Sequence, residues 1–172
     1  GRSAHAAEQY VLASQGASGR AALELRREAA IHWLAAGEHE RGKALLAQAL
    51  AELDLPVPSS TWTALARRLW LRARIWARGS SYRISERPKL SPDARARLEL
   101  CASTAVVLGT VDPIVGSCFG SLYQLLALRS GDREHIARAL LTEAVYLALI
   151  GDRARAARTR SCPRPCAGRR PT

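Results

Sequence analysis

Methionine is absent from this chain of 172 residues, and lysine is nearly absent. No encoded start is visible without a methionine, so we expect the chain to be part of a longer protein. Only Lys43 and Lys89 are lysines, and the remaining 24 of the 26 basic residues are arginines. Such a skew, together with abundant alanine and leucine, is typical of a GC-rich coding sequence and does not by itself indicate nucleic-acid binding.

Acidic residues are missing from two stretches. Seven arginines and no acid follow Asp152, and six arginines and no acid lie between Asp54 and Glu86. The whole chain has a formal net charge of +11. A basic surface attracts nucleic acid, anionic membranes and acidic partners nonspecifically, so the charge does not choose among them.

The four cysteines lack the even spacing of a secreted disulfide framework. Cys101 and Cys118 lie in apolar runs, where a free thiol behaves as a small buried hydrophobe. Cys162 and Cys166 lie in a tail of Pro, Arg, Gly and Thr that cannot form a core. We therefore predict a disordered basic tail at 161–172, no zinc site and a cytoplasmic location.

No apolar run is long enough to cross a bilayer. Asp112 is the only charged residue from Ala102 to Leu128, and Asp112-Pro113 divides this run into two pieces that are too short. Gly116 and Gly120 are four residues apart, which allows close contact between helices. We expect a buried helical hairpin here and no membrane span.

The spacing of apolar residues predicts an all-α chain, because no stretch alternates apolar and polar residues as a strand does. Ser91-Pro92 and Asp112-Pro113 each offer an N-cap side chain followed by proline at the first helical position. Residues 1–160 are expected to form one helical-repeat domain. The predicted helices lie at about 3–15, 20–36, 39–54, 60–78, 91–110, 113–129, 132–150 and a frayed 152–160.

The stretch "GEHERGK" (37–43) resembles a phosphate-binding loop but fails its chemical requirements. Such a loop follows a strand and ends with a serine or threonine that binds magnesium, whereas Ala44 stands here and a helix precedes. Glu38 and Glu40 would face the phosphates. The stretch is better explained as a turn between two helices, and a nucleotide-binding enzyme is only a remote alternative.

The histidines offer no catalytic or metal-binding constellation. His32, His39 and Glu38 are close in sequence, but no pair has the spacing that presents two ligands on one helix face. His135 and Glu143 are two turns apart, which is a common surface arrangement. We predict no catalytic residue, no metal site and no cofactor.

Glycine followed by an acid recurs at the expected hairpin turns. Small residues are needed where two helix backbones approach closely, and large ones fill the groove beside them. The hairpin around Gly37 best fits this pattern, and weaker versions surround Gly131 and Gly151. The residues predicted to serve repeat packing are Ala30, Gly37, Gly42, Leu46, Ala49, Gly131, Gly151 and Ala156.

The predicted helix at 60–78 is the most amphipathic element. Its apolar face is expected to pack inside the helical array, with the opposite arginines in solvent. A membrane-surface or nucleic-acid helix is the less favoured interpretation. The apolar face comprises Trp62, Leu65, Ala66, Leu69, Trp70, Ala73, Trp76 and Ala77, and the predicted basic surface comprises Arg67, Arg68, Arg72, Arg74 and Arg78.

Three stretches carry a resemblance to a family: "ALELRREAAIHWLAAGEHERGKALLAQALAELDLPVP" (22–58), "WTALARRLWLRARI" (62–75) and a long stretch at 98–144. They resemble the tetratricopeptide-like helical region of large bacterial serine/threonine protein kinases that also carry an ATPase module. Arg26 replaces the usual aromatic residue of the repeat, and Asp54 stands in place of proline. The resemblance implies a degenerate antiparallel helix-hairpin solenoid in a cytoplasmic signalling protein, with any catalytic or ATP-binding site in another part of the parent.

The resulting prediction is a non-catalytic scaffold for protein–protein or interdomain contacts within such a kinase. Its partner would be another protein or the kinase and ATPase domains of the same chain. The alternative is a basic helical module of a transcriptional regulator that binds nucleic acid.

Overall fold

The computed structural model describes residues 1–78, 84, 90–149 and 151–152. These residues form seven α-helices and no strand, so the all-α prediction is confirmed. The predicted helix at 152–160, apart from its first residue, and the tail at 161–172 lie outside the described residues, and with them Ala156, Cys162 and Cys166. The helices are α1 (Arg2–Gln15), α2 (Gly19–Ala35), α3 (His39–Ala51), α4 (Thr61–Arg78), α5 (Pro92–Val111), α6 (Pro113–Ser130) and α7 (Arg133–Leu149).

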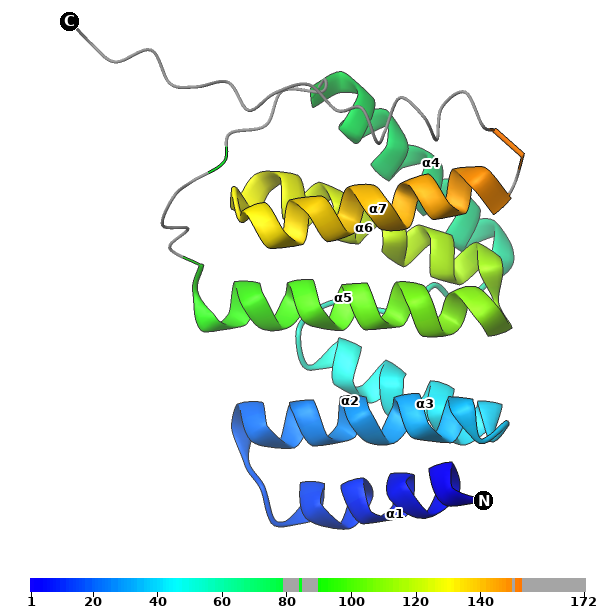
Figure 1. The fold of residues 1–172 in the computed structure, drawn as a ribbon, viewed down its shortest axis with the longest axis vertical. Helices are drawn as coiled ribbons and strands as arrows, with labels where there is room; N and C mark the ends of the chain where they lie inside the picture. Colours follow the sequence, from blue (N-terminus) through cyan, green and yellow to red (C-terminus); the bar gives the residue numbers. More distant parts are fainter. Residues whose placement is uncertain (79–83, 85–89, 150, 153–172) are drawn as a thin grey trace, which may run out of the picture.

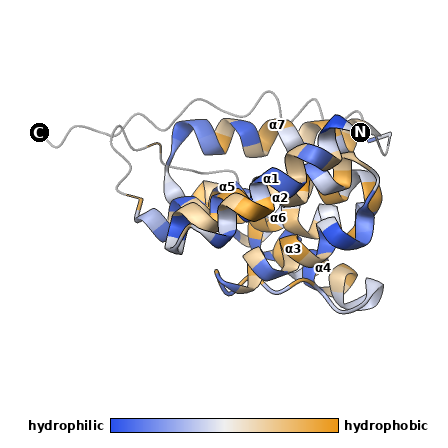
Figure 2. Cartoon of the chain, turned by 90° about the horizontal axis from the view of Figure 1, so that it is seen from below, coloured by the Kyte–Doolittle hydropathy of each residue, from blue (hydrophilic) through white to orange (hydrophobic). Residues whose placement is uncertain are grey.

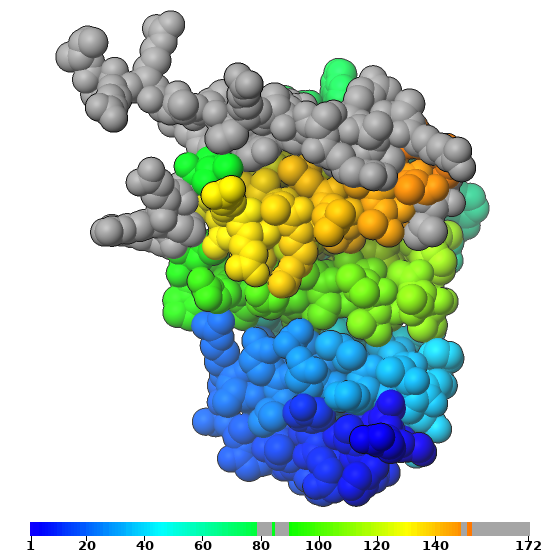
Figure 3. All heavy atoms as spheres, in the orientation of Figure 1, coloured from blue at the N-terminus to red at the C-terminus, as the bar shows by residue number. Residues whose placement is uncertain are grey.

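The helices stack along the long axis of the molecule (Figure 1). α1 to α3 occupy one end, α5 lies in the middle, and α6, α7 and α4 occupy the other end (Figures 1 and 3). Successive helices pair as antiparallel hairpins at α1–α2, α2–α3, α5–α6 and α6–α7. Hydrophobic and hydrophilic stretches alternate along the helices (Figure 2), and one core cluster runs from Leu23 in α2 to Ala139 in α7.

The helix ends follow the predicted local chemistry. Ser91 Oγ accepts a hydrogen bond from the N–H of Ala94 at 3.2 Å, and Asp112 Oδ1 accepts one from the N–H of Val115 at 3.1 Å. Gly131 ends α6 in the left-handed conformation, with φ of 70°. Asp132 Oδ1 then caps α7 by accepting from the N–H of His135. These side chains satisfy backbone groups that a helix terminus leaves without a partner.

α3 ends at Ala51, three residues before the predicted boundary. Asp54 takes a left-handed φ of 55°, and the N–H of Leu55 bonds back to the Leu50 carbonyl at 2.9 Å. This is the closing pattern that glycine usually makes at a helix C-terminus, and aspartate is one of the few other residues that tolerate it. Leu55 is buried after the turn, which fixes the direction in which the chain leaves α3.

The α2–α3 turn contains the stretch that resembles a phosphate loop. Gly37 has φ of 87°, the helix α2 precedes it, and α3 begins at His39. The prediction of a helical turn is therefore confirmed. An added Cβ on Gly42 would lie 2.4 Å from Leu34 Cγ and 3.1 Å from the Ala30 carbonyl oxygen. Gly42 thus lies where α3 approaches α2 most closely.

The α5–α6 hairpin is the most deeply buried part of the described chain. An added Cβ on Gly116 would lie 2.5 Å from both the Cα and the N of Gly109, so the two backbones touch. Gly120 faces Ala105 at an ordinary contact distance. Cys101 and Cys118 are free and buried, as predicted. Among the described residues no helix is long and apolar enough to cross a membrane.

α4 departs from the order of the sequence. It packs mainly on α6, although α3 precedes it and α5 follows it. The connection at 52–60 carries the chain to the end of the molecule opposite α1, where α4 crosses behind α6 and α7 (Figure 1). A regular solenoid would pack each helix on its sequence neighbours, so α4 is the element that the hairpin pattern did not predict.

Candidate interaction surface on helix α4

The side of α4 that packs against the protein is the opposite of the predicted side. Ala64 and Leu71 are fully buried, and Ile75 packs beside Leu71 against α6. In the helical projection these residues lie about 180° from Trp62, because each residue turns the helix by about 100°. The small cluster that they form contains Cys118 and Leu125 of α6. The arginine side of the helix therefore faces the core.

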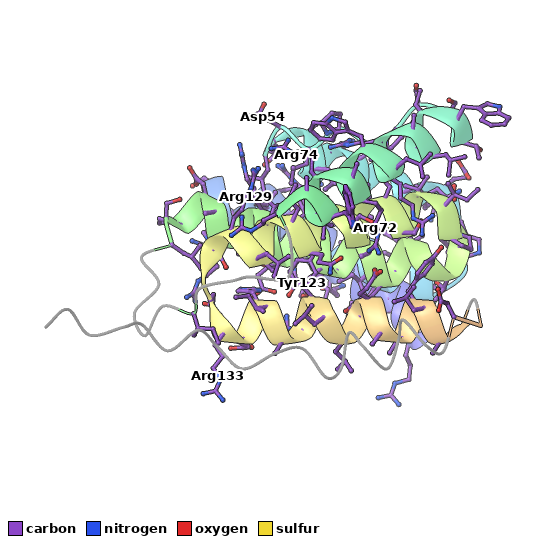
Figure 4. The ribbon with its side chains drawn as sticks, turned by 90° about the horizontal axis from the view of Figure 1, so that it is seen from above. Asp54, Arg72, Arg74, Tyr123, Arg129 and Arg133 are labelled. Atoms are coloured by element: carbon purple, nitrogen blue, oxygen red, sulfur yellow. The ribbon has the colours of Figure 1, made fainter. Side chains whose placement is uncertain are left out.

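Three arginines of α4 donate hydrogen bonds to other elements. Arg67 donates to the Pro56 carbonyl at 2.7 Å, and Arg78 donates to the Leu128 carbonyl at 2.9 Å. Leu128 belongs to the last turn of α6, where carbonyl groups lack helical partners and a cation is favourable. Arg72 lies on the side of α4 that faces α6 and α7 (Figure 4), where it pairs with Glu143 of α7 and lies 3.3 Å from Gln124 Oε1.

A fourth arginine, Arg68, stacks on the ring of Tyr146, with 5.1 Å between its guanidinium carbon and the ring centroid. A cleft of about 80 Å³ adjoins it, bordered also by Ser117 and Glu143. Arg68 Nε is buried without a protein hydrogen-bond partner, and a cleft of this size admits water that can hydrate it. The guanidinium groups of these four arginines therefore make contacts within the protein, although Arg78 remains exposed, and the basic surface stays a prediction. Arg74 has a different position, over Trp70 at 4.5 Å from the ring centroid.

The opposite side of α4 carries large apolar side chains that face solvent. Trp62 is 79% exposed, Leu69 is 59% exposed and Trp76 is 85% exposed. Ala66 and Ala73 between them are exposed too, and Trp70 lies at one edge. The prediction that this face packs inside the helical array is wrong. The arginines reach partners on α6, α7 and the 52–60 connection, and they leave the tryptophan side outside. We call Trp62, Ala66, Leu69, Trp70, Ala73 and Trp76 the α4 face.

Of the predicted surface pair, His135 is buried and Glu143 is half-buried. Tyr123 donates its hydroxyl proton to the His135 carbonyl at 3.2 Å, and Nδ1 of the same histidine lies 3.3 Å from the hydroxyl oxygen. Glu99 lies 3.6 Å from His135 Nε2. His135 and Glu143 therefore do not act as a pair: His135 contacts Tyr123 and Glu99, whereas Glu143 pairs with Arg72. Burial raises the pKa of the Tyr123 hydroxyl to about 12, so this group stays protonated at physiological pH and acts as a structural donor.

The residues predicted for repeat packing fall into three groups. Ala30, Gly42, Leu46 and Ala49 are buried at the contact between α2 and α3. Gly37, Gly131 and Gly151 adopt left-handed backbone conformations. Ala156 lies outside the described residues. Within the described ranges no three His, Cys, Asp or Glu side chains converge to hold a metal ion.

The ion pair between Arg72 and Glu143 had no local signal in the sequence, because 71 residues separate its members. The close contact of Gly109 with Gly116 had a weak signal in the sequence, because the two glycines are equally far from the turn at Asp112-Pro113. No family model, curated protein or solved structure matches this chain.

Replacing Glu143 with alanine is expected to lower the free energy of unfolding by about 2 kcal/mol. The Glu143 side chain is only 12% exposed, so its loss leaves the Arg72 charge with Gln124 alone. The full cost of breaking a buried pair is reduced because Arg72 retains contact with water. Urea unfolding followed by circular dichroism measures the change. Glu134→Ala is the control, because Glu134 belongs to an exposed pair with Arg138 on the same helix and should cost less than about 1 kcal/mol. Equal losses in the two variants would contradict the assigned role of the ion pair.

Proposed function

We propose that this chain is a non-catalytic helical scaffold that binds a protein partner through the α4 face. The observation that carries this proposal is the exposure of three large side chains along one helix, Trp62, Leu69 and Trp76. A contiguous apolar surface of this kind marks an interaction site on a soluble domain. Tryptophan is also among the residues most enriched at the energetic centre of protein interfaces.

The proposal includes a tetratricopeptide-like arrangement within a cytoplasmic, multidomain bacterial serine/threonine kinase and ATPase signalling protein. The left-handed turn at Gly37 and the close approach at Gly42 support a repeat hairpin at α2–α3. The displacement of α4 from sequence order fits a degenerate array rather than a regular one. The kinase and ATPase domains of the same protein are candidate partners for the α4 face.

Nucleic-acid binding is the less supported alternative. Phosphate contacts require arginines that are free to reach a backbone. Arg67, Arg72 and Arg78 instead donate to protein groups, and Arg68 stacks on Tyr146. The part of α4 that faces solvent is rich in tryptophan and alanine rather than arginine.

A photo-crosslinking amino acid at position 69 tests the proposal directly. We expect a specific protein adduct from this position, and no such adduct from position 141, which is equally exposed on α7. The adduct is identified by mass spectrometry and must then bind the chain as a purified protein. The same adducts from both positions, or measurable ATP turnover by the purified chain, would contradict a non-catalytic scaffold that acts through α4. A coding sequence for kinase and ATPase domains upstream of Gly1 is the expected genomic context, and its absence would remove the kinase assignment.

A further inference from the structure

Five residues of the α4 face follow a heptad seam. Trp62, Ala66, Leu69, Ala73 and Trp76 are separated by four, three, four and three residues. This is the spacing that keeps one stripe of a helix in contact with a second helix. At a rise of 1.5 Å per residue the seam extends over about 21 Å, which is about four helical turns. All five residues face solvent.

Large and small side chains alternate along this seam. Trp62, Leu69 and Trp76 project, and the exposed alanines at 66 and 73 leave hollows between them. A second helix can insert its own large side chains over the alanines, as in knobs-into-holes packing. A flat bilayer surface gains nothing from this alternation. The alternation of large and small side chains therefore favours a helix as the binding partner of this surface.

All the charged side chains of α4 are positive. Its five charged residues are all arginines, and it contains no acid. Arg74 lies beside the seam over Trp70, and Arg78 is exposed at the C-terminal end of the helix. The nearest acid in the preceding connection, Asp54, has Arg97 of α5 3.4 Å from its carboxylate. A second copy of this helix would place like charges opposite one another, which disfavours pairing of two α4 faces.

We propose that the α4 face receives an amphipathic helix with large apolar residues at its seam and aspartate or glutamate on its flanks. This inference rests on the proposed function and specifies the chemistry of its partner. The apolar seam would supply most of the affinity, and the acidic flanks would set orientation and association rate against Arg74 beside the seam and Arg78 at the exposed end of α4.

Three synthetic helical peptides of about three heptads test the inference with the full 172-residue chain. The first has leucine at the seam and glutamate on the flanks, the second has lysine on the flanks, and the third has serine at the seam with glutamate flanks. Fluorescence anisotropy of labelled peptides gives the dissociation constants. We expect the first peptide to bind at least about tenfold more tightly than the other two at low salt, and the advantage over the lysine peptide to shrink at high salt.

Two variants with matched exposure locate the binding. Leu69 is 59% exposed on α4 and Leu141 is 61% exposed on α7. Leu69→Lys should weaken binding of the first peptide by about tenfold or more, whereas Leu141→Lys should leave it unchanged. Arg74→Glu should reduce the preference for glutamate flanks. Circular dichroism establishes that each variant retains its helical fold.

The other outcomes overturn the inference in distinguishable ways. Equal binding of the glutamate and lysine peptides, lost in Leu69→Lys, removes the acidic partner but retains the α4 face as a protein-binding site. Binding that Leu69→Lys leaves intact removes the α4 face itself. A dimer in sedimentation that Leu69→Lys dissociates identifies a second copy as the occupant. Binding to vesicles with phosphatidylglycerol, without binding to any peptide, identifies an anionic membrane surface.

Discussion

Replacing Gly116 with alanine is expected to lower the free energy of unfolding by about 3 kcal/mol, the upper part of the range for overpacking. The new Cβ would lie 2.5 Å from the Cα and the N of Gly109 and 2.9 Å from the carbonyl carbon of Leu108. All three atoms belong to the backbone of α5, so no side chain can rotate away. α5 and α6 would have to separate along the most deeply buried hairpin of the described chain. Urea unfolding followed by circular dichroism measures the loss.

Gly120→Ala is the matched control on the same helix face. Its Cβ would meet Ala105 Cβ at 3.8 Å, an ordinary van der Waals contact. Alanine is favoured over glycine inside a helix by up to about 1 kcal/mol, so this variant should be unchanged or more stable. Similar stabilities for the two variants would show that α5 and α6 can move apart at little cost. That result would contradict the close backbone contact at Gly116.

Raising the pH from 9 to 11 is expected to lower the free energy of unfolding by about 4 kcal/mol. Burial raises the pKa of the Cys101 thiol from 9.0 to about 12, against a smaller opposing effect of Arg67 and Arg97. Burial also raises the pKa of the Tyr123 hydroxyl from 10.0 to about 12. The folded state holds both groups protonated in this range, while the unfolded chain loses their protons. Because the unfolded state then binds fewer protons, stability is fully present below pH 9 and falls as the pH rises.

The slope of stability against pH separates this effect from general alkaline damage. Cys101 contributes the larger share, about 2 kcal/mol between pH 9 and 11, because about 1.4 kcal/mol is lost per pH unit once the thiol of the unfolded chain is ionised. Cys101→Ala should lower stability at pH 8 by removing buried volume, yet it should show a much shallower decline above pH 9. Urea unfolding at pH 8, 9, 10 and 11 provides the comparison. A parallel decline in the two proteins would remove Cys101 as the titrating group.

The helices were predictable because the residues that start and end them act within a few positions along the chain. Ser91-Pro92 and Asp112-Pro113 specify helix starts within four residues of sequence, and Gly37 and Gly131 specify helix ends through a left-handed backbone. The buried hairpin was predictable for a similar reason, since an apolar run interrupted only by Asp112 must be covered. The early end of α3 was not predicted, because the left-handed turn falls on Asp54 rather than on a glycine.

The sequence predicted most of the residues that form the apolar side of α4, but it did not predict that this side faces solvent. Helical periodicity identified the apolar stripe of α4, of whose eight predicted residues seven are exposed and Leu65 is half-buried, but the stripe was assigned to the wrong environment. Periodicity separates the two sides of a helix but does not say which side meets the protein. An arginine stem is apolar over much of its length, so an arginine-rich side can also pack against a core when its charge finds a partner.

The sequence by itself determined that this protein is helical, where most of its helices begin and end, and which residues share the apolar stripe of α4. These properties depend on hydrogen bonds and side-chain spacing within a few turns of chain. Only the tertiary structure decided that α4 packs on α6 and turns its tryptophans outward. That choice depends on partners far away in sequence: Glu143 for Arg72, the Leu128 carbonyl for Arg78 and the Tyr146 ring for Arg68. A charge that is wholly or partly withdrawn from water needs such partners, and these partners converge only once α4, α6 and α7 have come together.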